Sequence, residues 1–267
     1  MTFRESAAPK HARRSFLSRV AGTLGAAAML GVHRSESGAS LAAEPPPVDG
    51  LEGIKALLAG KEPVTWVITG DSITHGALHT LGWRSYPEHF AERVRWELRR
   101  VRDIVINTGI SGDRVPGISA DLDWRVLQFK PHVVSLMFGM NDCTAGPAGR
   151  DQFRTDLGTL VERIRAAGAI PLLNTPNTVY VANSRGREDL PAYAQIVREY
   201  AEAHQIALVD HWKHWETAKP NQEDLLPWIE DKSIHPGVYG HREFAKEIFR
   251  VIGIYDEASP TCDLEVP

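Results

Sequence analysis

The sequence predicts a three-layer α/β/α domain built on a parallel sheet of about five strands. Short apolar runs alternate along the chain with longer segments whose apolar residues recur at helical spacing. The apolar runs are continuous rather than alternating, which is typical of strands that helices cover on both faces. The expected strands are residues 64–69, 104–106, 132–138, 169–173 and 206–209.

Helices are expected between these strands. In 83–101, Phe90, Val94 and Leu98 recur at helical spacing among many charged residues, which indicates a surface helix packed by one face. Lys130-Pro131 and Gly168 are stop signals for two further helices. The expected helices are 51–58, 83–101, 118–129, 151–167, 191–204 and 238–252, whereas 210–231 mixes short helix and loop.

The N-terminal segment 1–43 is predicted to be a twin-arginine signal peptide rather than part of the fold. Arg13-Arg14 precedes a mild apolar run, and small residues up to Ala43 suit cleavage. The alternative is a basic, disordered N-terminus with a chance arginine pair. Residues 44–60 then form a linker and a short helix, 61–255 the folded domain and 256–267 a tail. Export to the periplasm or beyond a bacterial cell is therefore expected.

The charge balance excludes some partners. Without residues 1–43 the chain has 24 basic and 32 acidic residues, so nucleic acid is a poor partner. The apolar run at 20–32 is shorter than the roughly 20 residues that a membrane span requires. We expect no nucleic-acid binding and no stable membrane insertion, whereas the oligomeric state is open.

Metal and disulfide chemistry have little support in the sequence. Cys143 and Cys262 are the two cysteines, and their spacing resembles no zinc site. An exported protein could pair them, but two free thiols are favoured. His211 and His214 alternate with tryptophans, yet a third ligand is missing nearby, which favours a partly buried aromatic helix. No metal and no organic cofactor are expected.

Three expected strands end in polar turns that contain glycine: Gly70-Asp71-Ser72, Ser111-Gly112-Asp113 and Gly139-Met140-Asn141-Asp142. The carboxyl ends of parallel strands share one edge of the sheet, where ligands bind, so these turns should be neighbours. His235 follows later, just before the last expected helix. The sequence therefore predicts a cluster of polar groups at that edge.

These groups are the parts that acyl transfer requires. Ser72 would be the nucleophile and His235 the base that takes its proton. The N–H groups of Ser72 and Gly112 and the Asn141 amide would be the oxyanion donors. Glycine suits position 112 because a bare backbone allows close approach to a substrate. The alternative for Ser72 is the N-cap of an ordinary strand-to-helix turn.

The order Gly-Asp-Ser, Ser-Gly-Asp, Gly-Xaa-Asn-Asp and His-Pro resembles the SGNH (GDSL) hydrolase family over about residues 64–252. This resemblance implies a flavodoxin-like fold and ester hydrolysis through an acyl-serine, without metal or organic cofactor. It also implies the roles given above for Ser72, Gly112, Asn141 and His235.

The sequence departs from the family at one position. The family usually has an orienting aspartate three residues before the histidine, where this chain has Lys232. Asp231 and Glu230 lie four and five residues before His235. A one-residue bulge would bring Asp231 to the ring and fix its tautomer. Alternatively, a backbone carbonyl orients His235, the site works as a Ser-His dyad, and Asp231 is a solvated surface acid.

Three further residues are candidates for lining the pocket. They are Asp71, His75 and Asp113. For Asp71 and Asp142, holding turns through hydrogen bonds to backbone amides is favoured over a role in catalysis, whereas His75 is equally suited to the first turn of a helix. The segment 175–187 is long enough to be a loop that faces the substrate.

The favoured function is an exported serine esterase for short acyl esters, such as acetyl groups on carbohydrate. Its substrate would be a small-molecule or carbohydrate ester. A lysophospholipase or thioesterase is the alternative within the same chemistry. A non-catalytic saccharide-binding domain is the alternative outside it, suggested by Lys232 and by seven tryptophans. The sequence lacks the Gly-Xaa-Ser-Xaa-Gly elbow, the dinucleotide fingerprint, the P-loop and the zinc-protease helix.

Overall fold

The computed structural model describes residues 50–263, so the expected signal peptide and the proline-rich linker lie outside the described residues. Within 50–263, five parallel strands form one sheet in the order β2-β1-β3-β4-β5. This order confirms the predicted flavodoxin-like sheet. The strands are β1 (Thr65–Gly70), β2 (Ile104–Asn107), β3 (Val133–Met137), β4 (Ile170–Asn174) and β5 (Ala207–Val209).

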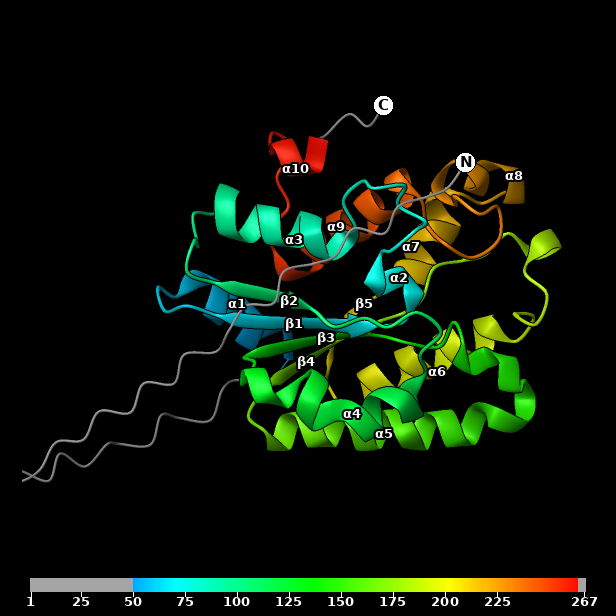
Figure 1. Ribbon diagram of the computed structural model, residues 1–267, viewed down its shortest axis with the longest axis horizontal. Coiled ribbons are helices and arrows are strands. Elements are labelled where there is room, and N and C mark those ends of the chain that lie inside the picture. Colours follow the sequence, from blue (N-terminus) through cyan, green and yellow to red (C-terminus); the bar gives the residue numbers. More distant parts are fainter. Residues whose placement is uncertain (1–49, 264–267) are drawn as a thin grey trace, which may run out of the picture. The chain divides into compact units, whose positions relative to one another are not determined.

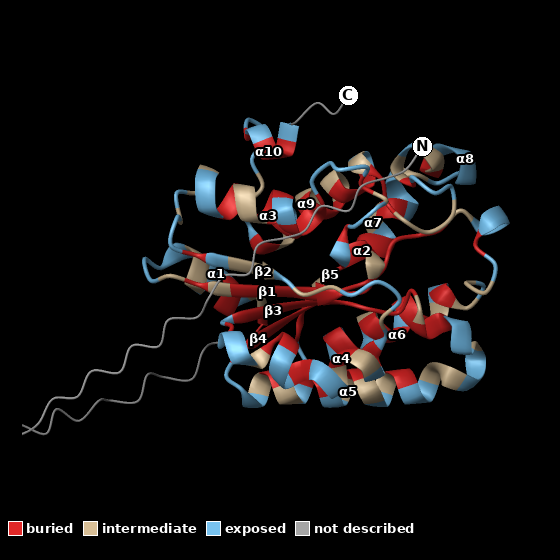
Figure 2. Ribbon diagram, viewed as in Figure 1, coloured by how far each residue is buried: buried red, intermediate tan, exposed pale blue. Residues whose placement is uncertain are grey.

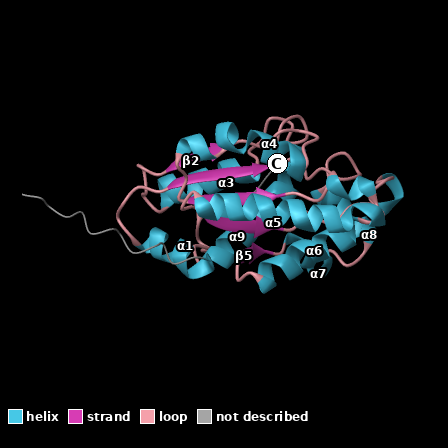
Figure 3. Ribbon diagram, turned by 90° about the horizontal axis from the view of Figure 1, so that it is seen from below, coloured by secondary structure: helices cyan, strands magenta, loops and turns pink. Residues whose placement is uncertain are grey.

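Helices cover the sheet on both sides, as the continuous apolar strands predicted (Figure 1). α3 (Tyr86–Glu92) and α9 (Val238–Ile252) lie on one side. α4 (Val115–Arg125), α5 (Arg150–Ala166) and α6 (Leu190–Ala203) lie on the other, where α5 runs across the face of the sheet (Figure 3). α1 (Gly50–Ala59) packs against β4, β5 and α9. The core is the layer between helices and strands, and β1, β3 and β4 are buried almost throughout (Figure 2).

The edge strand β2 differs from the expectation of a fully buried strand. Ile104 is 54% exposed, and Val105 and Ile106 are only partly buried. The reason is the strand order, which places β2 at the edge beside β1 alone. A run of three apolar residues does not reveal whether a strand is central or at an edge.

The helix expected over 83–101 is shorter and changes type. It begins at Tyr86, because Ser85 and Glu88 form a capping box at that point. After Glu92 the backbone becomes π-helical over η1 (Arg93–Glu97). Buried Arg93 there donates to the Ile254 carbonyl at 2.7 Å, which ties this helix to the chain after α9. The expected helix 118–129 starts earlier, at Val115, and its last turn is a separate 3-10 segment, Leu127–Phe129.

The described part of the tail packs onto the domain. A short helix α10 (Pro260–Asp263) docks on η1, where the Glu97 carboxylate accepts from the Thr261 N–H at 2.7 Å. Cys262 and Cys143 are both buried and free, as the sequence favoured. None of the helices described in 50–263 combines the length and the apolar character that crossing a membrane requires.

We predict that Gly70, which joins β1 to the Asp71-Ser72 turn, tolerates no side chain. An added Cβ would lie 2.2 Å from Thr74 Oγ1 and 2.6 Å from the Met137 carbonyl oxygen. Gly70→Ala should therefore lower the free energy of unfolding by about 1–3 kcal/mol. Gly60→Ala is the matched control, since a Cβ there meets nothing closer than 3.4 Å. Urea unfolding of both variants measures the difference, and equal midpoints would contradict the prediction.

Candidate active site

Ser72 lies at the carboxyl edge of the sheet, as the first residue of the short helix α2 (Ser72–His75). Asp71 caps this helix by accepting from the Ile73 N–H at 2.9 Å. Gly76, with φ of 70°, ends it and donates its N–H to the Ser72 carbonyl. The glycine and the cap thus turn the chain sharply after β1, and Ser72 stays only partly buried.

Ser72, His235 and Asp231 form a continuous hydrogen-bonded chain. Ser72 Oγ lies 2.9 Å from His235 Nε2, and His235 Nδ1 lies 2.5 Å from Asp231 Oδ2. An ionised carboxylate only accepts, so the proton of a neutral His235 ring sits on Nδ1. Nε2 is then free to accept from the Ser72 hydroxyl, which is the arrangement that general-base activation of a serine requires.

The turn before His235 explains how Asp231 reaches the ring despite the extra residue. Lys232 takes the left-handed conformation, with φ of 52°, and so absorbs that residue. The Asp231 Oδ1 accepts from the N–H groups of Ser233, Ile234 and His235 at 2.9–3.1 Å. Asp231, rather than Glu230, therefore faces the ring.

Two opposed effects act on the Asp231 carboxyl. Partial burial would raise its pKa, but the hydrogen bonds from His235 and from the turn outweigh burial and hold the pKa below its ordinary value. Asp231 is thus ionised at neutral pH. The negative charge fixes the His235 tautomer and would stabilise the imidazolium that forms when the ring takes a proton.

Gly112 and Asn141 lie in the two neighbouring turns. Gly112 has φ of 82°, which favours glycine, and a Cβ there would meet nothing within 4 Å. No acceptor within 50–263 takes the Gly112 N–H. The Asn141 Nδ2 donates to the Asp113 carbonyl at 3.0 Å and lies 3.4 Å from Asp71 Oδ2.

Sequence reasoning missed Arg187, which holds the other end of the Asn141 amide. Its guanidinium donates to Asn141 Oδ1 at 3.2 Å from the loop between β4 and α6. This bond selects the orientation in which the amide NH₂ faces the turns. The length of the 175–187 loop was the available signal, but it did not single out Arg187.

The three candidates for lining the pocket take different positions. His75 is exposed, and its Nδ1 lies 3.0 Å from Ser111 Oγ, beside Gly112. Asp113 forms an ion pair with Arg125 at 2.5 Å, so its link to Asn141 is its main-chain carbonyl. Asp71 is buried beneath the turn. Asp142 bonds the N–H groups of Val115 and Gly139, which confirms that it holds loops.

Burial raises the pKa of Asp71 to about 7. The hydrogen bond from the Ile73 N–H acts in the opposite direction but is the smaller effect. Up to about pH 4 this carboxyl is protonated in both folded and unfolded chains. Between about pH 4 and 7 only the unfolded chain loses the proton, so stability falls, and above this range the penalty is constant.

We therefore predict that the difference in unfolding free energy between Asp71→Asn and the unmodified protein shifts in favour of Asp71→Asn as the pH rises. Its advantage should be about 2–4 kcal/mol larger at pH 8 than at pH 4. Urea unfolding at both pH values measures this difference, and comparing the two pH values cancels the fixed effect of the substitution. An advantage that does not change with pH would show that Asp71 is ionised with an ordinary pKa.

His79 is a second histidine at the site that the sequence did not reveal. Its ring stacks on His235, with centroids 3.6 Å apart and planes at 3°. Possible ligand atoms of His79, Asp231 and His235 lie within 4.8 Å of one another. A metal ligated by both rings would have to lie near both ring planes, which two parallel stacked rings do not permit. These three residues therefore fit stacking better than metal ligation.

The second group of histidines, on α7 (His211–Ala218), is part of the packing, as expected. His211 and Trp215 are fully buried, and burial lowers the pKa of His211 well below its ordinary value. His214 faces Glu243 and Glu247 at 3.4 and 3.6 Å. The α7 histidines are thus engaged in core packing and in contacts with carboxylates of α9.

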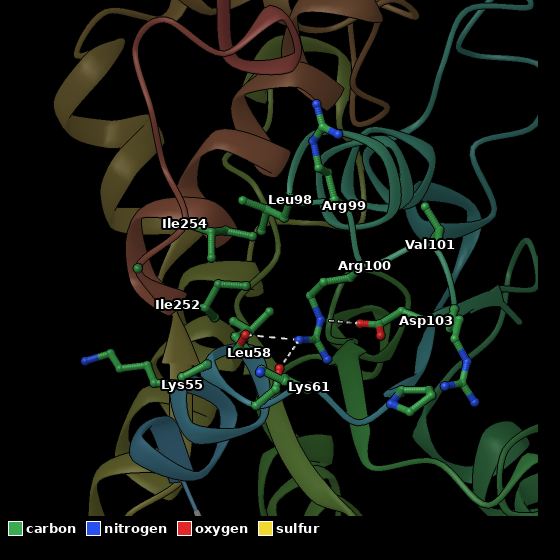
Figure 4. A pocket seen from close by; sticks show the side chains of 15 residues that line it. Lys55, Leu58, Lys61, Leu98, Arg99, Arg100, Val101, Asp103, Ile252 and Ile254 are labelled. Carbon is green, nitrogen blue, oxygen red and sulfur yellow. Dashed lines mark hydrogen bonds and ion pairs between the residues drawn. The ribbon is translucent and has the colours of Figure 1, made fainter.

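Two cavities differ in their relation to this site. One, of about 900 Å³, lies at the opposite edge, before β1 and β2 (Figure 4). There Arg100 is engaged by Asp103 and by the carbonyls of Leu58 and Gly60, and Lys55 and Arg99 point in different directions. The other, of about 660 Å³, is lined by Arg187, whose guanidinium also bonds Asn141, but Ser72, Asn141 and His235 are not among its lining residues.

The model of the GDSL-like lipase/acylhydrolase family matches residues 68–243, a span that contains Ser72, Gly112, Asn141 and the Asp231–His235 turn. The chain belongs to this family. As a member of this SGNH hydrolase family it is a carboxylic ester hydrolase. The family assignment thus agrees with both the observed fold and the motifs in the sequence.

Named relatives of this GDSL-like hydrolase include an acetylxylan esterase from Geobacillus stearothermophilus. The two are 29% identical over 209 residues, which cover 69% of this chain and 91% of the esterase. An uncharacterised lipoprotein, YqeF, of Bacillus subtilis is 26% identical over 56% of this chain and 71% of its own length.

Solved structures show the same fold. A catalytic mutant (H194A) of the acetylxylan esterase Axe2 from Geobacillus stearothermophilus superposes with a TM-score of 0.60 at 25% identity. It covers 73% of this chain and 97% of that chain. LAE5, an α/β hydrolase from the Lake Arreo metagenome, gives a TM-score of 0.62 at 22% identity over 73% of this chain and 99% of its own.

Proposed function

We propose that this hydrolase is an exported serine esterase that removes short acyl groups, acetyl above all, from carbohydrate. The observation that carries the catalytic part is the chain Ser72–His235–Asp231, with both contacts at hydrogen-bond distance. The relation to an acetylxylan esterase over 91% of that protein supports the substrate.

Acylation would begin when Ser72 Oγ attacks the ester carbonyl carbon and its proton passes to His235 Nε2. Asp231 stabilises the resulting imidazolium through Nδ1–H. The oxyanion would accept from the N–H groups of Ser72 and Gly112 and from the Asn141 amide, where each such donor contributes about 3 kcal/mol. The imidazolium then protonates the leaving alcohol oxygen, the C–O bond breaks, and the acyl group remains on Ser72.

Deacylation would repeat these steps with water as the nucleophile. His235 Nε2 takes a proton from water as the oxygen attacks the acyl carbon, and then returns a proton to Ser72 Oγ as the acid leaves. Arg187 would keep the Asn141 amide in this orientation in both halves of the reaction, because it holds Oδ1 at 3.2 Å.

We assign the carbohydrate part of the substrate to the cavity that Arg187 lines. Its lining is mixed: the polar or charged residues include Arg187, Glu188, Glu216, Lys219 and Gln222, and the apolar residues are Val179, Val181, Pro191, Trp212 and Pro220. Side chains that donate and accept hydrogen bonds match sugar hydroxyls better than a long acyl chain.

Acetate release from acetylated xylo-oligosaccharide, compared with a p-nitrophenyl acyl series from acetyl to dodecanoyl, tests this proposal. We expect acetate release, and a kcat/KM that falls as the acyl chain lengthens. Ser72→Ala is the control for background hydrolysis. Activity confined to long acyl chains would overturn the acetyl-esterase assignment.

A specific feature favours a lipid-like substrate as the second candidate. The loop after α2 exposes Leu78, Leu81 and Trp83, by 80%, 65% and 47%. Apolar side chains beside an active site suit an acyl chain or an amphiphile. A rise of kcat/KM with acyl-chain length in the same series would favour a lysophospholipase or thioesterase over an acetyl esterase.

A non-catalytic saccharide-binding domain has lost its main support. That interpretation assumed that Lys232 leaves His235 without an orienting group, whereas Asp231 contacts Nδ1 at 2.5 Å. Of the seven tryptophans, Trp66, Trp212 and Trp215 are buried. The exposed Trp83, Trp96 and Trp124 lie on three different segments, the loop after α2, η1 and α4.

Export is proposed from Arg13-Arg14 and the segment that follows them. Replacing both arginines by lysine should retain the protein inside the producing cell. Cell fractionation and the mass of the processed chain are the measurements. Unchanged export of the Lys-Lys variant would contradict a twin-arginine signal.

A further inference from the structure

The outer face of the His235 ring is covered by His79. The two rings are parallel within 3°, and their centroids are only 3.6 Å apart. The edges of the His235 ring are fixed separately, by Ser72 at Nε2 and by Asp231 at Nδ1. Within the described residues His79 is the ring that stacks on His235, and a stacked ring opposes motion perpendicular to its plane.

The loop that carries His79, residues 76–84, is folded tightly enough to hold it there. Leu78 and Leu81 have φ of 65° and 53°, so non-glycine residues in the left-handed conformation stand on both sides of His79. Such strain persists only where the surroundings enforce it, and it concentrates at functional sites. The buried Thr80 hydroxyl donates to the Gly76 carbonyl at 3.0 Å, which closes the loop on itself.

We propose that His79 is a positioning residue for the general base. By stacking on His235, it keeps the ring in the plane that joins Ser72 to Asp231, and it shields that face from water. This inference rests on the proposed function of Ser72, His235 and Asp231. It concerns a residue outside the family motifs on which the proposed function was built.

The charge state of His79 is consistent with this role. Burial lowers its pKa and the neighbouring His235 lowers it further, whereas the carboxylates of Asp231 and Glu230 act in the opposite direction. A neutral ring stacks on the imidazolium that forms during acyl transfer, whereas a second cation would repel it.

The test uses three variants and two readouts. His79→Phe keeps an aromatic ring and His79→Ala removes it. His204→Ala is the matched control, because His204 also stacks on an aromatic ring, that of Tyr200 with centroids 4.2 Å apart, but at the end of α6. The readouts are kcat and KM for p-nitrophenyl acetate, and the rate at which a fluorophosphonate labels Ser72. Thermal unfolding of each variant shows whether the fold is retained.

We expect His79→Ala to lower kcat and the labelling rate about 3- to 10-fold, the range that an aromatic pair supplies, with KM nearly unchanged. His79→Phe should restore most of this loss, and His204→Ala should behave like the unmodified protein. A kcat for His79→Ala equal to that of the unmodified protein would overturn the proposal. So would a loss that Phe does not restore, or one that His204→Ala shares.

These outcomes separate the two proposals. If the unmodified protein neither labels nor turns over ester, the proposed function fails before His79 is tested. If the unmodified protein is active and the His79→Ala variant matches it, the esterase stands and only the positioning role is wrong.

Discussion

His235→Ala should lower kcat for ester hydrolysis by about 10⁵- to 10⁶-fold while the protein stays folded. The Ser72 hydroxyl would then lack the acceptor that now lies 2.9 Å away, and a serine without a base is a weak nucleophile. The remaining rate over water would come from the oxyanion donors and from substrate binding. Steady-state kinetics with p-nitrophenyl acetate, together with thermal unfolding, measure both properties.

The matched control for this variant is His204→Ala. His204 stacks on Tyr200 at the end of α6, just before β5 and so at the opposite edge of the sheet. It should lose no more than a small part of kcat. Ser72→Ala combined with His235→Ala should be no slower than either single variant, because the two residues act as one unit. Additive losses would mean that His235 does not act through Ser72.

Asp231→Asn should lower kcat by about 10⁴-fold with little change in KM. The asparagine side chain is nearly isosteric but can present an N–H to His235 Nδ1, which favours the tautomer with the proton on Nε2. That ring could no longer accept from Ser72, and the charge that stabilises the imidazolium would be lost as well. Kinetics with the same ester measure the effect.

Glu230→Gln is the control, because Glu230 was the other carboxylate that the sequence offered as the orienting acid. The structure places the Glu230 main-chain N–H on the His235 carbonyl at 2.9 Å, whereas the carboxylate on the ring is that of Asp231. Glu230→Gln should therefore keep nearly full activity. A large loss in Glu230→Gln, with little in Asp231→Asn, would reverse the assignment.

Most of the fold could be predicted because its signals are local. The central strands are continuous apolar runs, and Gly-containing turns mark their carboxyl ends, which gives both the parallel sheet and its functional edge. The exceptions depend on tertiary context. β2 is exposed because of the strand order. The π-helical segment begins at Arg93, whose guanidinium bonds the carbonyl of Ile254, far away in the chain.

The predictions for the site divide in the same way, into those with local signals and those that depend on long-range contacts. Ser72, Gly112, Asn141 and His235 could be proposed as site residues because each lies at a recognisable turn. The role of Asp231 could not be decided from the sequence, because nothing there indicates that Lys232 adopts the left-handed conformation. Arg187 and His79 were missed because each makes its contact with a segment far away in the sequence. Arg187 donates to the Asn141 amide and His79 stacks on His235, and no residue spacing indicates either contact.

Intact-mass analysis after fluorophosphonate treatment tests most directly whether Ser72 is an activated nucleophile. The probe forms a covalent adduct only with a serine that a base and oxyanion donors activate. We expect one adduct on the unmodified protein, mapped to Ser72 by peptide analysis, and none on Ser72→Ala. An unlabelled protein, or an adduct that persists in Ser72→Ala, would contradict the proposed catalytic role of Ser72.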